Sequence, residues 1–189
     1  MIALLAAGSA LYPQSTNASV IAGPVVNPDN GHRYYLLSQA SWTLSRDEAL
    51  ALGGNLATIN DVPEQNWIFS TFGSFAGENR SLWIGLNDEA QEGTFVWASG
   101  EPVVFTNWLP GQPDDNAQSG GEDYAHIIKT GNGFGVTPGA WNDLADTAGT
   151  FPEFAPTHGI AEVIPEPSAL LILFASAAAF GLRRRRVRS

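Results

Sequence analysis

The feature that most limits how this chain can fold is a long segment without hydrophobic periodicity, from Glu101 to Gly121. It is rich in Gly, Pro, Asn and Asp, and segments with helix or strand patterns lie on both sides of it. Long loops without secondary structure are uncommon in compact domains and are usually functional. We therefore expect a folded domain in which this loop carries the functional site.

Residues 111–123, which cover the end of this loop and the two residues after it, read GQPDDNAQSGGED and contain four carboxylates without a Lys or Arg. We call this stretch the acidic loop. So many like charges in one short loop are unfavourable unless solvent or cations intervene. A solvated acidic loop is one interpretation. The other is a cation cage, because Ca²⁺ takes six to eight oxygen ligands from carboxylates, amides, backbone and water. Glycines allow such a loop to turn sharply around an ion.

The segments around the loop predict an α+β domain. Residues 41–54 predict a helix that Ser41 or Ser45 caps, and residues 61–73 predict a second helix with Asp61 as its N-cap. Short apolar or alternating runs predict strands or extended segments at residues 34–37, 55–60, 81–86, 93–99, 123–129, 141–143 and 159–164.

Charge and motif content exclude several classes of function. Residues 1–164 contain 18 acids and four bases, and this balance repels nucleic acid and anionic lipid. The chain has no Cys, so it has no disulfide and no thiolate metal site. His32, His126 and His158 are scattered, and no Ser-His-Asp pattern, phosphate loop or zinc-helix motif is present. A carboxylate pair can cleave glycosides, but carboxylates that hold calcium are not free for this, so we expect no enzyme.

Five motifs, in this order, resemble the C-type lectin-like domain over roughly Asn27–Val163. The resemblance implies two helices, two small antiparallel sheets and a long calcium-binding loop, with Trp83 and Trp141 in the core. The motifs are Gly53-Gly54-Asn55-Leu56-Ala57, Leu82-Trp83-Ile84-Gly85-Leu86, Gln112-Pro113-Asp114, Gly121-Glu122-Asp123 and Trp141-Asn142-Asp143.

The resemblance also implies the site residues. In sugar-binding members of the family, the positions that match Gln112, Asp114, Glu122, Asn142 and Asp143 bind calcium and sugar together. Two sugar hydroxyls replace water on the ion, and the same side chains hydrogen-bond to those hydroxyls. A cis peptide bond before the intervening proline would direct Gln112 and Asp114 to the same side, and X–Pro is the common place for such a bond.

A second calcium site is implied by two acids outside the loop. Asp88 and Glu92 match positions at which some family members bind an auxiliary calcium ion. Asp115, Glu122 and Asp123 would complete the set of ligands of this second calcium site.

The order Gln-Pro-Asp implies, within the family, a galactose-type rather than a mannose-type preference. Galactose binders usually carry an aromatic residue soon after this motif, to stack on the sugar. Here Asn116 and Ala117 follow, the next aromatic is Tyr124, and Trp108 matches a packing position. We therefore expect a calcium-dependent carbohydrate-binding protein. The alternative is a calcium-stabilised structural or adhesive domain that binds a protein partner without binding sugar.

The family's disulfide positions are occupied by other residues. Ala49 and Ala161 match the bridge between the first helix and the last strand, and Tyr124 and the region of Asp146 match the second. Because a native disulfide contributes roughly 2–5 kcal/mol in small secreted domains, we expect calcium to contribute to the stability of this chain.

Both ends of the chain predict export. Residues 1–26 form a signal-like segment that lacks a positively charged start, with cleavage expected near Ala10 or Ala18. Residues 164–189 resemble the PEP-CTERM sorting signal of Gram-negative bacteria: Pro165-Glu166-Pro167, an uncharged transmembrane run over 168–182, and Arg183–Arg186. The resemblance implies recognition by an exosortase, a transient membrane anchor with the domain outside, and a final place at the cell surface or outside the cell. A buried C-terminal helix is the alternative.

Overall fold

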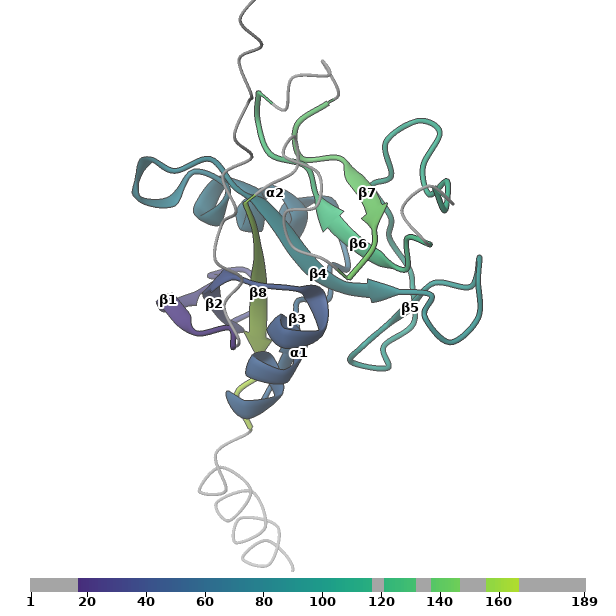
Figure 1. The fold of residues 1–189 in the computed structure, drawn as a ribbon. Coiled ribbons are helices and arrows are strands. Elements are labelled where there is room, and N and C mark those ends of the chain that lie inside the picture. Colours follow the sequence, from purple (N-terminus) through teal and green to yellow (C-terminus); the bar gives the residue numbers. More distant parts are fainter. Residues whose placement is uncertain (1–16, 117–120, 132–136, 147–155, 167–189) are drawn as a thin grey trace, which may run out of the picture.

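The computed structural model describes residues 17–116, 121–131, 137–146 and 156–166, and Figure 1 shows their arrangement. Two α-helices and a sheet confirm the predicted α+β class. The helices are α1 (Trp42–Ala51) and α2 (Val62–Phe72), followed by a 3-10 turn, η1 (Phe75–Gly77); the strands are β1 (Val20–Val26), β2 (Arg33–Gln39), β3 (Asn55–Leu56), β4 (Ser81–Asn87), β5 (Val96–Trp97), β6 (Tyr124–Ile127), β7 (Trp141–Leu144) and β8 (Thr157–Val163).

The strands form one connected sheet in the order β1-β2-β8-β4-β6-β7, with β3 on β8 and β5 on β4. Every pairing is antiparallel except that of β4 with β8, which is parallel from Ser81↔Thr157 to Trp83↔Gly159. We expected two small antiparallel sheets. The structure contains two antiparallel parts, and the parallel pair joins them because the last strand returns to the middle of the sheet.

The sheet begins upstream of the predicted domain boundary at Asn27. Strand β1 pairs with β2 from Val20↔Leu37 to Val26↔Arg33. Ala18, just before it, is 4% exposed and belongs to a core cluster. The domain therefore includes part of the segment that we interpreted as signal-like. The sequence VIAGPVV gave no clear strand pattern because Gly-Pro interrupts it, and the pairing with β2 is irregular at that place.

Of the two predicted N-caps of helix α1, Ser41 and Ser45, the structure uses Ser41. The Ser41 hydroxyl accepts a hydrogen bond from the Leu44 N–H at 3.2 Å. A second contact at the start of this helix comes from Asp146, two residues after the end of β7. Its carboxylate accepts hydrogen bonds from the N–H and the hydroxyl of Thr43, at 2.8 and 2.6 Å. Noncovalent contacts therefore connect α1 to the region of Asp146, which matches a position of the family's second disulfide.

Helix α1 packs closely against β8. Ala49 and Ala161, which match the other disulfide, are both fully buried in one core cluster. Gly54, after the helix, allows this approach, since a Cβ there would lie 1.9 Å from the Glu162 carbonyl oxygen. Apolar packing between helix and strand thus occupies the place of the covalent bridge.

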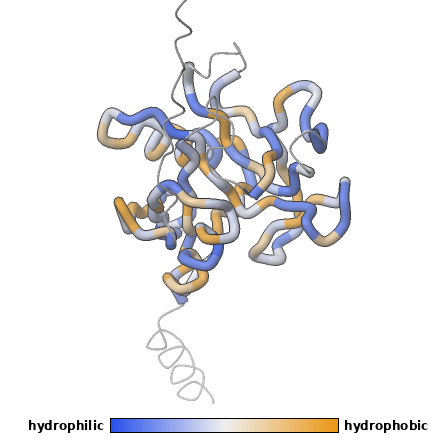
Figure 2. Tube along the Cα trace, viewed as in Figure 1, coloured by the Kyte–Doolittle hydropathy of each residue, from blue (hydrophilic) through white to orange (hydrophobic). Residues whose placement is uncertain are grey.

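Four Trp side chains lie among the largest fully buried groups: Trp42, Trp83, Trp97 and Trp141. Figure 2 shows hydrophobic residues along the strands, including the edge strand β1, and hydrophilic residues mainly in the loops. The loops between β4 and β7 extend from one side of the sheet, away from α1 (Figure 1). Among the described residues near the end of the loop, Asp114 is exposed, whereas Glu122 is buried.

The described residues contain no helix that is long and apolar enough to cross a membrane. The predicted transmembrane run 168–182, the Arg block and residues 1–16 lie outside the described residues.

Candidate functional site

Trp141 connects the acidic loop to the core. Its backbone N–H donates to the Asn107 carbonyl and its carbonyl accepts from the Leu109 N–H, both at 2.8 Å. Its buried indole packs edge-on against Phe105 and Trp108, with ring centroids 5.6 and 5.8 Å apart. Residues 107–109 of the loop and the start of β7 are therefore held together. The burial of Trp141 and its contact with Trp108 confirm Trp141 as a core residue and Trp108 as a packing residue.

Gln65 on α2 fixes Trp141 from the other side. Its amide oxygen accepts from the Trp141 indole N–H and its amide nitrogen donates to the Gly139 carbonyl, both at 2.8 Å. Gln65 is 4% exposed, so both bonds are shielded from water. Sequence reasoning missed this residue, because nothing in a helical Gln identifies a partner 76 residues away.

The first acidic group combines the loop with β7. Ligand atoms of Asp114, Glu122 and Asp143 lie within 4.8 Å of one another, with Asp114 exposed and the other two buried. Asp114 follows Pro113, and the Gln112–Pro113 bond is cis. The structure thus brings together three of the five residues predicted to bind calcium and sugar.

Asp143 organises the loop around this group. Its carboxylate accepts from the backbone N–H groups of Asp114 and Asp115, at 3.1 and 3.0 Å. Asp115 has a positive φ of 41°, a conformation that Asp tolerates better than most residues. Its carboxylate in turn accepts from the Glu122 N–H at 3.0 Å. The loop is therefore folded back on itself by its own acids.

The other two predicted residues, Gln112 and Asn142, are not among the residues whose ligand atoms meet in this group. The Gln112 side-chain oxygen is buried, and no donor among the described residues reaches it. Asn142 lies on β7 with 5% exposure, and its amide nitrogen donates to the Asp143 carbonyl. The direct participation of both residues in binding stays a prediction.

A second acidic group lies at the end of β4. Ligand atoms of Asp88, Glu92 and Asp123 lie within 4.8 Å of one another. One Asp88 oxygen accepts from the Gly93 N–H at 2.8 Å. The other is buried without a partner among the described residues, and Asp88 is 1% exposed. These three residues are the core of the predicted auxiliary site.

The two groups divide the remaining predicted ligands. Glu122, which we assigned to both sites, lies with Asp114 and Asp143. Asp115 lies between the groups: it bonds to Glu122, and its charge is one of the causes that raise the pKa of Asp123. Asp115 therefore interacts with one residue of each group.

Burial and like charge both oppose ionisation of these acids. Burial raises the pKa of Asp143, although the N–H groups of Asp114 and Asp115 lower it, and the Asp114 charge adds to the increase. Burial likewise raises the pKa of Asp88, and the negative charge of Asp123 raises it further. Burial also raises the pKa of Asp123, and the negative charge of Asp115 adds to that increase. A bound cation would favour the charged carboxylates and would therefore lower these pKa values.

The donor chemistry of the two groups fits calcium. Every candidate ligand in them is a carboxylate or amide oxygen, the type of ligand that Ca²⁺ prefers. A buried acceptor without a donor costs roughly 1–3 kcal/mol. Among the described residues, one such oxygen belongs to Asp88 in the second group, and another to Gln112, two residues before Asp114. Asp114, Glu122 and Asp143 with Gln112 would hold one ion, and Asp88, Glu92 and Asp123 the other.

The three His residues do not form one site. His126 lies on β6, fully buried against Trp83, and burial lowers its pKa to about 3, so it is neutral. His158 contacts the Leu37 carbonyl through Nδ1 at 2.8 Å. His32 contacts Glu162, away from both acidic groups.

The chain belongs to the C-type lectin family, because the family sequence model for the lectin C-type domain matches residues 38–148. Members of this family are carbohydrate-binding proteins and not enzymes, which confirms the expectation that the chain is not an enzyme. C-type lectin domains typically bind Ca²⁺.

Two curated relatives are lectins. The chain is 41% identical over 93 residues to an alpha-N-acetylgalactosamine-specific lectin of Patiria pectinifera, covering 49% of this chain and 51% of the relative. It is 37% identical over 87 residues to nattectin, a galactose-specific lectin of Thalassophryne nattereri, covering 45% and 55%. The chain thus spans about half the length of these relatives.

A solved structure agrees with the fold. The carbohydrate-recognition domain of the mouse scavenger receptor C-type lectin aligns with a TM-score of 0.55 and 29% identity, over 72% of this chain and 91% of that domain. The predicted C-type lectin fold is thereby confirmed.

We expect calcium to raise the melting temperature of the full chain. A ligand that binds only the folded state adds about 2.7 kcal/mol per site at a hundredfold excess over Kd, and a domain of this size gains roughly 2–4 °C per kcal/mol. Calorimetric melting in calcium and in a calcium chelator measures the shift, with magnesium as the control ion. Equal melting temperatures in calcium and chelator would show that the acids are only a solvated loop.

Proposed function

We propose that this chain is an exported, calcium-dependent lectin of galactose type, which binds glycans at the cell surface or in an exopolysaccharide matrix. The observation that carries the proposal is the meeting of Asp114, Glu122 and Asp143, together with the side-chain oxygen of Gln112, which is buried and has no hydrogen-bond donor among the described residues. An ion held there would present its open positions to solvent along the exposed edge of Asp114. Two neighbouring sugar hydroxyls fill such positions and bond to the same side chains.

The galactose type is supported by sequence order and by relatives. Gln112 precedes and Asp114 follows Pro113, so the amide comes before the carboxylate in the motif. The two lectin relatives are specific for galactose or N-acetylgalactosamine according to their names. The stacking aromatic does not come from Trp108, because its ring packs against Phe95 and Trp141.

Exchanging the two residues around the proline tests the sugar type. Wild type should be retained on galactose beads in calcium and released by chelator. The double variant Gln112→Glu/Asp114→Asn should shift retention toward mannose beads, because donor and acceptor change places. The exchange keeps the net charge of the chain, so a change in retention cannot come from a change in net charge.

The outcomes also separate the rival function. Retention on neither sugar, together with a calcium-dependent melting temperature, would favour the structural or adhesive domain. Galactose retention that survives chelation, or that the double variant leaves unchanged, would contradict the proposed site.

Export is supported by the sequence at both ends. The sorting signal would follow directly after β8, since that strand ends at Val163 and the motif begins at Pro165. The uncharged run 168–182 and Arg183–Arg186 follow it. At the other end, Ala18 lies in the core, so we propose signal cleavage nearer Ala10 than Ala18.

Mass spectrometry tests this export route in a Gram-negative host with an exosortase. The mature chain should end near Pro165–Pro167 and lack Arg183–Arg186. A Pro165→Ala/Pro167→Ala variant should retain the tail and stay in the membrane fraction. A wild-type chain that keeps its tail in the cytoplasm would contradict the proposal.

A further inference from the structure

Strand β8 leads out of the domain beside the last turn of α1. The two elements run in the same direction: a Cβ at Gly159 would lie 2.6 Å from the Ser45 Cβ, and one at Gly54, after the helix, would lie 2.9 Å from Val163 Cγ2. Figure 1 shows the end of β8 beside α1, with β5, β6 and β7 on another side of the molecule. The chain therefore leaves the domain at the C-terminal end of α1.

Apolar side chains are exposed around this point. Leu50, in the last turn of α1, is 53% exposed, Val26, at the end of β1, is 54% exposed, and Ile164, directly after β8, is 55% exposed. Val26 pairs with Arg33, and Arg33 pairs with Val163, so these three side chains lie in one row on one face of the sheet. We call the following residues the exit surface: Val26, Arg33, Leu50, the partly buried Leu52, Val163 and Ile164.

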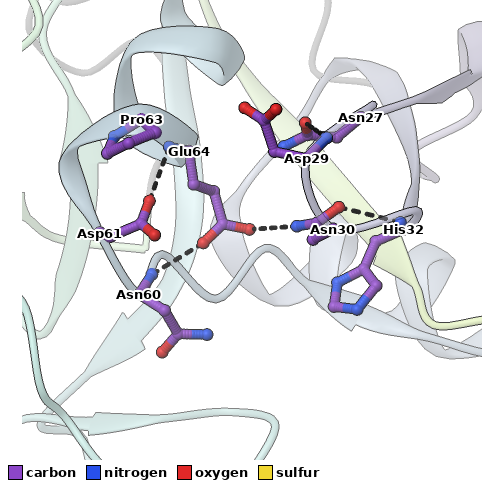
Figure 3. Close-up of a pocket in the computed structure, with 8 residues that line it drawn as sticks. All are labelled: Asn27, Asp29, Asn30, His32, Asn60, Asp61, Pro63 and Glu64. Carbon is purple, nitrogen blue, oxygen red and sulfur yellow. Dashed lines mark hydrogen bonds between the residues drawn. The ribbon is translucent and has the colours of Figure 1, made fainter.

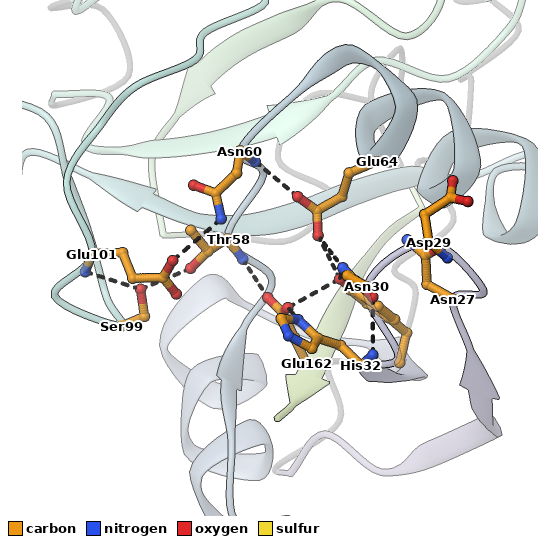
Figure 4. Close-up of polar contacts among 11 residues, drawn as sticks. Asn27, Asp29, Asn30, His32, Thr58, Asn60, Glu64, Ser99, Glu101 and Glu162 are labelled. Atoms are coloured by element: carbon orange, nitrogen blue, oxygen red, sulfur yellow. Dashed lines mark hydrogen bonds and ion pairs between the residues drawn. The ribbon is translucent and has the colours of Figure 1, made fainter. Parts of the chain in front are cut away.

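The polar neighbours of this row in the chain point to the other side of the sheet, toward α2. Asn27 and His32 line a pocket together with Glu64 of α2 (Figure 3). Glu162 accepts from the Thr58 N–H at 2.9 Å and contacts His32, as Figure 4 shows. These strand ends therefore turn polar side chains inward and apolar ones outward, whereas a sheet face in contact with water usually presents the polar ones. The exit surface is thus poorly suited to water alone.

Arg33 is the one charged member of the exit surface. It is exposed, and no acid among the described residues forms an ion pair with it. Exposed apolar side chains beside a free guanidinium suit a lipid interface, because the apolar groups enter the acyl boundary and the guanidinium bonds to phosphate. Glu48 and Glu166, each two residues away in sequence, add to the negative charge of the domain, so zwitterionic lipid suits this surface better than anionic lipid.

The predicted membrane segment begins close to the exit surface. Only residues 164–167 separate the end of β8 from the uncharged run 168–182. An extended chain spans at most about 3.6 Å per residue, so the chain from Val163 to Ser168 reaches at most about 18 Å. The headgroup layer takes about 5–8 Å of this reach. With residues 168–182 in a bilayer, the exit surface would therefore lie within about 10–13 Å of the lipid headgroups.

We propose that the exit surface docks on the zwitterionic lipid interface of the membrane while residues 168–182 anchor the chain. The inference rests on the proposed export route and adds an orientation to it. The apolar side chains of the surface enter the boundary between headgroups and acyl chains, and Arg33 bonds to lipid phosphates. A short tether gives an effective concentration of about millimolar, so a contact too weak to hold a free domain is still occupied.

This orientation keeps the candidate sugar site open. The loops between β4 and β7 extend away from α1 (Figure 1), so docking through the end of α1 leaves them off the membrane. Asp114, at the edge of the first acidic group, is exposed and stays accessible to glycans. Docking would thus fix the direction in which the anchored domain presents its acidic loop.

Fluorescence quenching by lipid, on the full chain in phosphatidylcholine vesicles, tests the docking. The chain has no Cys, so Leu50→Cys and Val104→Cys each give one site for a fluorescent label. Val104 is a matched control, because it is an apolar residue that is 69% exposed on the loop between β5 and β6. With a nitroxide on a fraction of the headgroups, we expect about threefold stronger quenching at Leu50, because only side chains in the interface meet the nitroxide.

A charge reversal tests the contact of Arg33. Arg33→Glu should reduce the quenching at Leu50 to the level at Val104, while Lys129→Glu, with the same change in net charge, should leave it unchanged. Circular dichroism checks that Arg33→Glu is folded. Should it not fold, the comparison of the Leu50 and Val104 labels in the otherwise unchanged chain decides.

Flotation of the same vesicles measures the anchor separately. A chain that does not float with the vesicles would overturn both the anchor and the docking. A chain that floats but shows equal quenching at Leu50 and Val104 would overturn the docking and leave the anchor. Stronger quenching at Leu50 only in vesicles that also contain an exosortase would assign the exit surface to a protein partner and overturn lipid docking. Quenching that Arg33→Glu leaves unchanged would overturn the contact assigned to Arg33.

Discussion

The anchoring of Trp141 is the contact on which the rest of the site depends. Its backbone joins the loop at Asn107 and Leu109, and its indole is held by Gln65 on α2. The next two residues in the chain are Asn142 and Asp143, so their position follows from the buried tryptophan. An otherwise irregular loop can therefore present its oxygens in a fixed place, because rigid elements hold functional groups more accurately than free loops do.

Electrostatics explains why such a loop is unfavourable without a cation. The two groups place Asp143, Asp88 and Asp123 where burial and neighbouring carboxylates raise their pKa values. Backbone N–H groups compensate for part of this cost, as those of Asp114 and Asp115 do for Asp143. The buried oxygens of Gln112 and Asp88 receive no such compensation from the described residues. Cation binding supplies the missing charge and ligands together.

Local signals were predictable from the sequence, and long-range pairings were not. Asp61 as a helix cap and the order of the β4, β6 and β7 segments follow from caps and apolar patterns. The parallel contact of β4 with β8 and the bonds of Gln65 depend on tertiary packing that leaves no local pattern. For the site, the sequence indicated which acids take part, but not which acids share a group. Glu122 lies with Asp143 and not with Asp88, and this depends on the backbone conformation of the loop, including the positive φ of Asp115.

Calcium titration calorimetry on the full chain and on Asp143→Ala is the most direct test of the central claim, that the buried acids of the loop form a calcium cage. The account predicts two saturable ions for wild type. It predicts one for the variant, because Asp143 belongs to only one of the two groups. Two ions of unchanged affinity in Asp143→Ala, or no binding to wild type at millimolar calcium, would contradict it.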